Sequence, residues 1–162
     1  MQKVEHPFPP VVDESCRILI LGSFPSVKSR ADGFFYGHPQ NRFWRMLAAI
    51  FHEEIPTDIP AKKALLLRHH IALWDVIASC EIEGSSDASV KNAVPVAISN
   101  ITGVAPIRRV LCNGALAGKL YKRHLQSATS IEAIVLPSTS PANAAWSLDM
   151  LVNAWREALQ PC

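Results

Sequence analysis

The sequence has few cysteines, no long apolar run and no apolar leader, and each shortage excludes a class of protein. The four cysteines form no C-x-x-C pair, which argues against a zinc site or an iron–sulfur cluster. No window approaches the ~18 consecutive apolar residues of a membrane helix, and the first residues lack an apolar signal core. We therefore expect a soluble, intracellular, cytoplasmic protein that needs no metal and no other cofactor.

Several catalytic and nucleotide-binding motifs are also missing. Without G-x-S-x-G, neither Ser23 nor Ser26 can be assigned to an esterase-like triad. G-x-G-x-x-G and the P-loop are absent, so a non-catalytic nucleotide-binding module stays open only as an alternative. A sugar glycosidase would need two carboxylates across the bond, and Asp75 is the one carboxylate near an expected strand end.

The composition is that of one globular domain. The chain has 162 residues, of which 49% are hydrophobic and 19% charged. A net charge of +2 is compatible with a polyanionic partner but does not require one. Three of the cysteines lie in or beside expected strands, where a free cysteine packs as a small apolar residue.

The apolar pattern predicts strands that alternate with helices. Four apolar residues before Gly22 indicate a strand that is covered on both faces. We expect strands at 16–21, 71–77, 109–112 and 131–136, and helices at 41–51, 61–69, 115–125 and 141–159. The alternation predicts an α/β fold, a three-layer α/β/α sandwich with a central four-stranded parallel sheet.

The remaining segments connect these elements. Residues 1–15 contain three prolines and no periodic pattern of apolar residues. We therefore expect them to be an extended lead-in to a single domain of residues 1–162. Residues 83–89 have turn composition, and 95–101 is ambiguous between a short helix and a loop. Asp58 is expected to cap the second helix, and Ser140 with Pro141 to begin the last one.

Polar and turn residues follow each expected strand. They are G-S-F-P-S at 22–26, Asp75, Asn113, and P-S-T-S-P at 137–141. Because the carboxyl ends of parallel strands meet at one edge of the sheet, these residues are expected to line a cleft.

Three segments carry a family resemblance over nearly the whole chain. The segments G-S-F-P-S at 22–26, G-F-F-Y-G-H-P-Q-N-R-F-W at 33–44 and L-P-S-T-S-P-A-N at 136–143 resemble the uracil-DNA glycosylase superfamily. Within it the chain is most similar to the hypoxanthine-DNA (deoxyinosine) glycosylase branch. The resemblance implies a monofunctional, monomeric glycosylase for base excision repair of single- or double-stranded DNA at the nucleoid. The alternative is a mismatch-specific uracil/thymine glycosylase.

Two departures from the wider superfamily favour the hypoxanthine branch. Phe24 stands where the mismatch-specific branch has an asparagine that positions water, and Leu136 stands where the main uracil branch has a histidine. In the hypoxanthine branch the asparagine of H-P-x-N is thought to carry catalysis, and here it is Asn41.

The chemistry needs a positioned water and dipoles for the departing base rather than a metal. The nucleotide must first be flipped out of a duplex. An asparagine carbonyl can orient water but is a poor proton acceptor, so we expect Asn41 to act by orientation. Asp75 is the second catalytic candidate, as support for water activation, and its alternative role is to cap a turn.

Each of the other site candidates also has two interpretations. The resemblance assigns Tyr36 to stacking on the flipped base, although it could be an ordinary half-buried aromatic. His38 could act as an acid or brace its loop, Asn113 could read the base edge or make a turn with Gly114, and Asn41 could simply cap a helix. The residues that we expect to bind the flipped base are Gly22, Ser23, Phe24, Tyr36, His38 and Asn113.

A further group of residues with side-chain hydroxyls is expected to bind DNA. Ser138, Thr139 and Ser140 precede an expected helix, where hydroxyls and the helix dipole would suit a phosphate, although they could equally be a capping cluster. Ser26 is expected to bind DNA together with these three residues.

Overall fold

A four-stranded parallel sheet forms the centre of the computed structural model, which describes residues 2–82 and 91–162. Its strand order is β3 (Ile71–Asp75), β2 (Ile18–Gly22), β6 (Arg109–Asn113) and β7 (Ala133–Leu136). All three pairings are parallel, and the register sets Gly22 beside Asp75. The predicted sheet is therefore confirmed, with its carboxyl ends at one edge.

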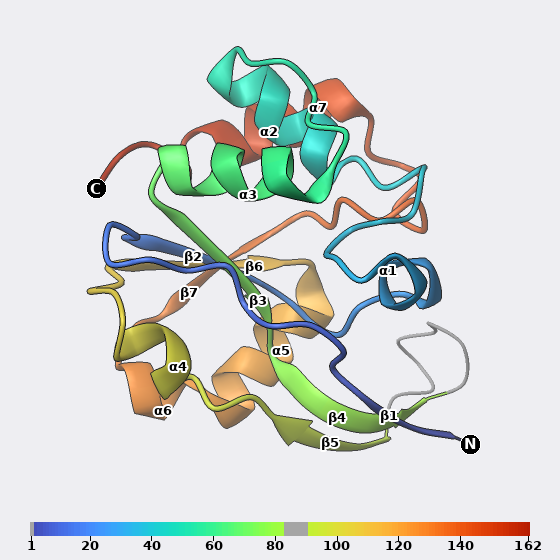
Figure 1. Cartoon of the computed structure of the whole chain (residues 1–162), viewed down its shortest axis with the longest axis vertical. Coiled ribbons are helices and arrows are strands. Elements are labelled where there is room, and N and C mark those ends of the chain that lie inside the picture. The colour runs from blue at the N-terminus through green and yellow to red at the C-terminus, as the bar shows by residue number, and fades with distance from the viewer. Residues whose placement is uncertain (1, 83–90) are drawn as a thin grey trace.

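Helices cover both faces of this sheet (Figure 1). On one face lie α2 (Phe43–Phe51), α3 (Ile59–Arg68) and α7 (Leu148–Arg156), and α5 (Ala115–His124) lies on the other. Every residue of β2 and β3 is buried, as expected for strands covered on both faces. The α/β/α sandwich predicted from the alternation is thus observed.

The predicted cap of α3 is confirmed because its signal is local, and the helix begins at Ile59, two residues before the expected start. The Asp58 side chain accepts a hydrogen bond of 2.8 Å from the Ala61 N–H, and Pro60 occupies the first turn. The predicted start of the last helix is wrong. α7 begins at Leu148 with Ser147 as its cap, and residues 137–147 form a loop.

Arg42 accounts for that loop. Its guanidinium donates hydrogen bonds to the backbone carbonyls of Ser140 (2.8 Å), Asn143 (3.2 Å) and Trp146. A helix starting at Pro141 would direct such carbonyls to its own N–H groups instead. The clamp from a distant residue therefore delays the helix by about two turns.

A second sheet, which the sequence did not predict, lies beside the first. β1 (Gln2–Glu5), β4 (Ile77–Ile82) and β5 (Lys91–Pro95) pair antiparallel in the order β1-β4-β5. The predicted strand at 71–77 is two strands, because the chain leaves the parallel sheet after Asp75 and enters β4 at Ile77. The expected lead-in thus contributes a strand, and the expected loop at 83–89 lies outside the described residues.

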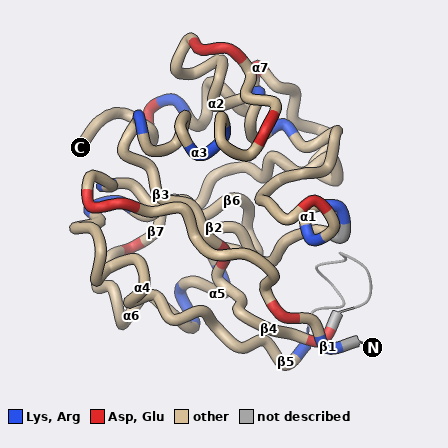
Figure 2. The backbone as a smooth tube through the Cα atoms, in the orientation of Figure 1, with Lys and Arg blue, Asp and Glu red and all other residues tan. Residues whose placement is uncertain are grey.

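Three short helices complete the fold. α1 (Val27–Asp32) was not predicted, α4 (Ser99–Thr102) falls at the end of the ambiguous segment 95–101, and α6 (Gln126–Thr129) follows α5. Figure 2 shows basic and acidic positions interspersed over the tube. Within residues 2–82 and 91–162, no helix is both long and apolar enough to cross a membrane.

Candidate active site

A cavity of about 290 Å³ opens at the carboxyl ends of β2, β3 and β6. The start of α5 and the loop after β7 complete its wall. The structure brings together these predicted site residues: Gly22, Ser23, Phe24, Ser26, Tyr36, Asn41, Asp75, Asn113, Ser138, Thr139 and Ser140. The predicted cleft therefore exists.

Gly22 gives the floor of the cavity its shape. A Cβ atom at this position would lie 2.4 Å from Asp75 Oδ1 and 2.9 Å from the Tyr36 hydroxyl oxygen. Both distances are shorter than a carbon can tolerate, so no side chain fits here without displacing those groups. The absence of a side chain at Gly22 lets the carboxylate and the phenol approach each other.

Tyr36 is held rigidly at this point. Its backbone is left-handed (φ 54°), and its ring packs on Phe43 with centroids 4.2 Å apart. The hydroxyl lies close to Asn113, but its geometry completes no hydrogen bond with any described residue. Burial and the nearby Asp75 carboxylate raise the pKa of Tyr36 well above its ordinary value, so the phenol stays protonated and can donate.

Thr139 connects the two asparagines of the site. It is fully buried, and its hydroxyl accepts a hydrogen bond from Asn113 Nδ2 (3.0 Å) and donates one to Asn41 Oδ1 (2.9 Å). Its backbone N–H donates to Asn113 Oδ1 (3.0 Å). Thr139 thus fixes the orientation of both amides, and its burial removes it from any contact with DNA phosphates.

The side-chain carbonyl oxygen of Asn41 accepts two hydrogen bonds from within the protein. Besides the Thr139 hydroxyl, Oδ1 accepts the Phe43 N–H at 3.0 Å, which occupies both lone pairs. Because a backbone N–H can only donate, it also identifies the oxygen, and the amide nitrogen must be on the other side. In this geometry the carbonyl has no lone pair left with which to orient a water. What Asn41 retains is its Nδ2 donors.

The remaining hydroxyl candidates make local contacts. Ser26 caps α1, Ser138 Oγ accepts the Ser140 N–H (3.1 Å), and Ser140 Oγ accepts the Ala142 N–H (3.2 Å). No helix begins at residue 141, so the predicted helix dipole behind Ser138 and Ser140 is absent. The argument for a phosphate site there loses its main support.

His38 does not line the cavity. Its Nδ1 accepts a hydrogen bond of 3.0 Å from the Gln40 N–H, and its carbonyl accepts the Asn41 N–H at 2.9 Å. These contacts match the interpretation of His38 as a brace for its loop rather than as a base-binding residue.

Two residues with clear roles escaped the sequence reasoning. Arg42, which clamps the loop after β7, lies inside the most specific motif of the chain and could have been noticed there. His6, whose Nε2 lies 2.7 Å from Asp75 Oδ2, sits in a proline-rich segment without any period. No local signal marks it.

Comparison with known proteins agrees with this architecture. Residues 9–159 match the family model of the Uracil DNA glycosylase superfamily. A protein from Methanosarcina barkeri named Hypoxanthine DNA glycosylase is 37% identical over 155 residues, 94% of this chain and 96% of the relative. Its namesake from Methanosarcina acetivorans is 37% identical over 146 residues, 89% and 91% of the two chains.

A solved structure supports the same assignment. The solution NMR structure of a candidate uracil DNA glycosylase from Methanosarcina acetivorans has a TM-score of 0.77 and 33% identity, covering 98% of this chain and 100% of its own. Together with the match over residues 9–159, this likeness establishes that the chain belongs to the uracil DNA glycosylase superfamily.

Proposed function

We propose that this chain hydrolyses the N-glycosidic bond of hypoxanthine in DNA as a monofunctional, monomeric glycosylase of the cytoplasm. The observation that best supports this proposal is the 37% identity, over 94% of the chain, to a relative named Hypoxanthine DNA glycosylase. The cavity supports it, since about 290 Å³ lies at the lower limit of small-molecule pockets and suits one flipped base.

The departing base requires hydrogen-bond donors. As the glycosidic bond breaks, negative charge moves onto the purine, whose ring nitrogens and O6 can accept hydrogen bonds. The unpartnered Tyr36 hydroxyl, the second Nδ2 hydrogen of Asn113 and the Nδ2 group of Asn41 are donors on the wall of the cavity. Fixed donors of this kind stabilise developing charge without reorganisation.

The attacking water requires an acceptor. In this proposal Asp75 supplies it, because Oδ1 lies against Gly22 at the cavity floor while Oδ2 is bound to His6. Asn41 then stabilises charge through its amide N–H, and Asp75 orients the water and accepts its proton. Asp75 thus takes over the orientation of the water that the sequence assigned to Asn41, in addition to the support of water activation expected of it.

Phe24 favours hypoxanthine over the mismatch alternative. Its half-buried ring lines the cavity where the mismatch-specific branch carries a water-positioning asparagine. An aromatic ring offers a purine apolar contact area but cannot hold a water.

Base release from defined duplexes tests the proposal. Otherwise identical labelled duplexes would contain deoxyinosine, uracil, a thymine mismatch or ethenoadenine, with EDTA present. We expect much faster release from deoxyinosine, and abasic sites without strand breaks. Uracil release at an equal or higher rate would reject the hypoxanthine assignment, and no release from any duplex would reject the glycosylase itself.

A further inference from the structure

The segment before β2 inserts a histidine behind the cavity. His6 follows β1 directly, and its N–H donates to the Ala78 carbonyl at 2.7 Å, which continues the pairing of β1 with β4. The His6 side chain is only 6% exposed, and its Nε2 lies 2.7 Å from Asp75 Oδ2. Residues 69 positions apart thus meet in the protein interior.

Aromatic rings fix the orientation of the imidazole. Phe8, Phe24 and Phe35 surround it with ring centroids 4.7, 5.9 and 5.8 Å away, the first two edge-on. Nδ1 is buried without a hydrogen-bond partner in the described chain, so the contact with Asp75 is the one polar contact of the ring there. Such a ring can turn little, and it presents Nε2 in one direction.

Asp75 depends on this contact. Its side chain is 4% exposed, and within the described residues His6 supplies its one hydrogen bond. An unpaired carboxylate at such a depth is strongly unfavourable, and a single partner on Oδ2 also determines where Oδ1 points. Oδ1 faces Gly22 and the Tyr36 hydroxyl at the cavity floor.

We propose that His6 is a positioning residue for base excision, which holds Asp75 so that Oδ1 meets the attacking water. His6 does not line the cavity and acts only through the carboxylate. The N-terminal strand is on this account part of the active site. The inference rests on the proposed glycosylase function.

Substitutions at His6 separate positioning from packing. His6→Phe keeps an aromatic ring among its neighbours and removes the donor, whereas His6→Gln keeps an amide donor near the Nε2 position. We expect His6→Phe to lower the single-turnover rate on deoxyinosine DNA by about 10- to 100-fold, the size of the loss seen when the hydrogen-bond partner that orients a metal ligand is removed. His6→Gln should recover part of the rate, and DNA affinity should change little in either variant.

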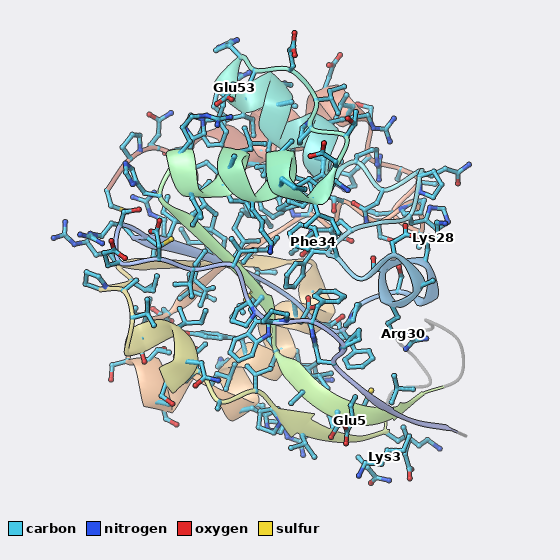
Figure 3. All side chains as sticks on the ribbon, viewed as in Figure 1. Lys3, Glu5, Lys28, Arg30, Phe34 and Glu53 are labelled. Carbon is cyan, nitrogen blue, oxygen red and sulfur yellow. The ribbon has the colours of Figure 1, made fainter. Side chains whose placement is uncertain are left out.

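Glu5→Gln is the matched control. Glu5, the last residue of β1, immediately precedes His6 but is exposed, and Figure 3 shows its side chain at the surface of the molecule, beside Lys3. This variant should release hypoxanthine at the wild-type rate.

A double-mutant cycle with Asp75→Asn tests whether His6 acts through Asp75. In the Asp75→Asn background, which has no buried carboxylate to destabilise the fold, His6→Phe should cause no further loss of rate. Additive losses, or a wild-type rate for His6→Phe alone, would overturn the proposal while leaving the glycosylase function intact. If His6→Phe alone fails to fold, His6→Gln and the double variant still decide the matter. A wild-type protein that releases no base would instead overturn the function on which the proposal rests.

Discussion

Thr139 determines which atoms of the two site asparagines can reach a substrate. Its hydroxyl and N–H occupy Asn113 Oδ1, one Nδ2 hydrogen of Asn113 and one lone pair of Asn41. What remains free is the Nδ2 group of Asn41, together with one Nδ2 hydrogen and one Oδ1 lone pair of Asn113, so donors outnumber acceptors on these two amides. A site rich in donors is suited to a leaving group that gains negative charge.

Asn41→Asp and Asn41→Ala therefore give a prediction at the scale of a single residue. Aspartate keeps an acceptor for Phe43 and Thr139 but loses the amide donor, so its thermal stability should stay near wild type. We expect its single-turnover rate to fall by about 10²–10³-fold, as when one positioned donor is removed. Alanine should lose a similar rate and also about 0.5–2 kcal/mol of stability, because the helix start loses its acceptor.

Circular dichroism melts and single-turnover rates on the two variants distinguish the possible roles. An aspartate variant with most of its activity would show that Asn41 acts as an acceptor for water. An alanine variant that melts early but cleaves at the wild-type rate would reduce Asn41 to a cap.

At the scale of elements, an ionic contact joins the end of α2 to the end of α3. Glu53 contacts Arg68, with 3.4 Å between its Oε2 and the Arg68 Nε, and also contacts His69. His69 stacks on Phe51 with centroids 3.8 Å apart. Glu53, Arg68 and His69 do not line the cavity, so this contact bears on stability and not on the site. Figure 3 shows Glu53 at the opposite end of the molecule from Lys3 and Glu5.

The pH dependence of this contact can be predicted with its sign. The hydrogen bond from Arg68, followed by that from His69, lowers the pKa of Glu53 below its ordinary value of 4.5. A lowered pKa means that the contact stabilises the fold above about pH 4.5 and ceases to do so as the pH falls through the folded value. Glu53→Gln should lower the free energy of unfolding at pH 7 by up to about 1 kcal/mol, as for other surface pairs.

Urea unfolding at about pH 7 and about pH 3 measures this difference. The difference in unfolding free energy between wild type and Glu53→Gln should be smaller at the lower pH, because the wild-type protein has then lost the same interaction. Glu54→Gln is the control, since the adjacent Glu54 makes no ion pair within the described residues. A gap between Glu53→Gln and wild type that grows at low pH would contradict the assignment.

For the whole molecule, the cysteines report on the integrity of the core. Cys16, Cys80 and Cys112 are buried and Cys162 is exposed. Burial raises the pKa of the Cys16 thiol to about 11 and that of Cys112 to about 12, so neither forms appreciable thiolate near neutral pH.

A thiol-reactive dye at about pH 8 should therefore modify one cysteine rapidly in the native protein and all four after unfolding. Cys162→Ser should abolish the rapid phase. Rapid modification of a second thiol in that variant would mean that the core opens more readily than its packing implies.

The fold class and the place of the site followed from local pattern. Apolar runs bounded by turn residues identified all four parallel strands. β2 and β3 are continuously apolar because both of their faces are covered, whereas β7 keeps its apolar run although Ile134 and Val135 are exposed. Asp58 was identified as a cap because the residues that it serves lie within one turn of it. The polar residues after the strands met in one cavity because parallel strands all end at the same edge.

The tertiary structure decided what those site residues can do. Arg42 holds carbonyls 98 to 104 residues away and delays α7, Thr139 lies 98 residues from the Asn41 carbonyl that it occupies, and His6 meets Asp75 across 69 residues. Contacts over such separations leave no period or spacing in the sequence, since they depend on how whole elements pack. The sequence by itself determined which residues gather at the sheet edge, and only the packed structure determined which of their atoms stay free for a substrate.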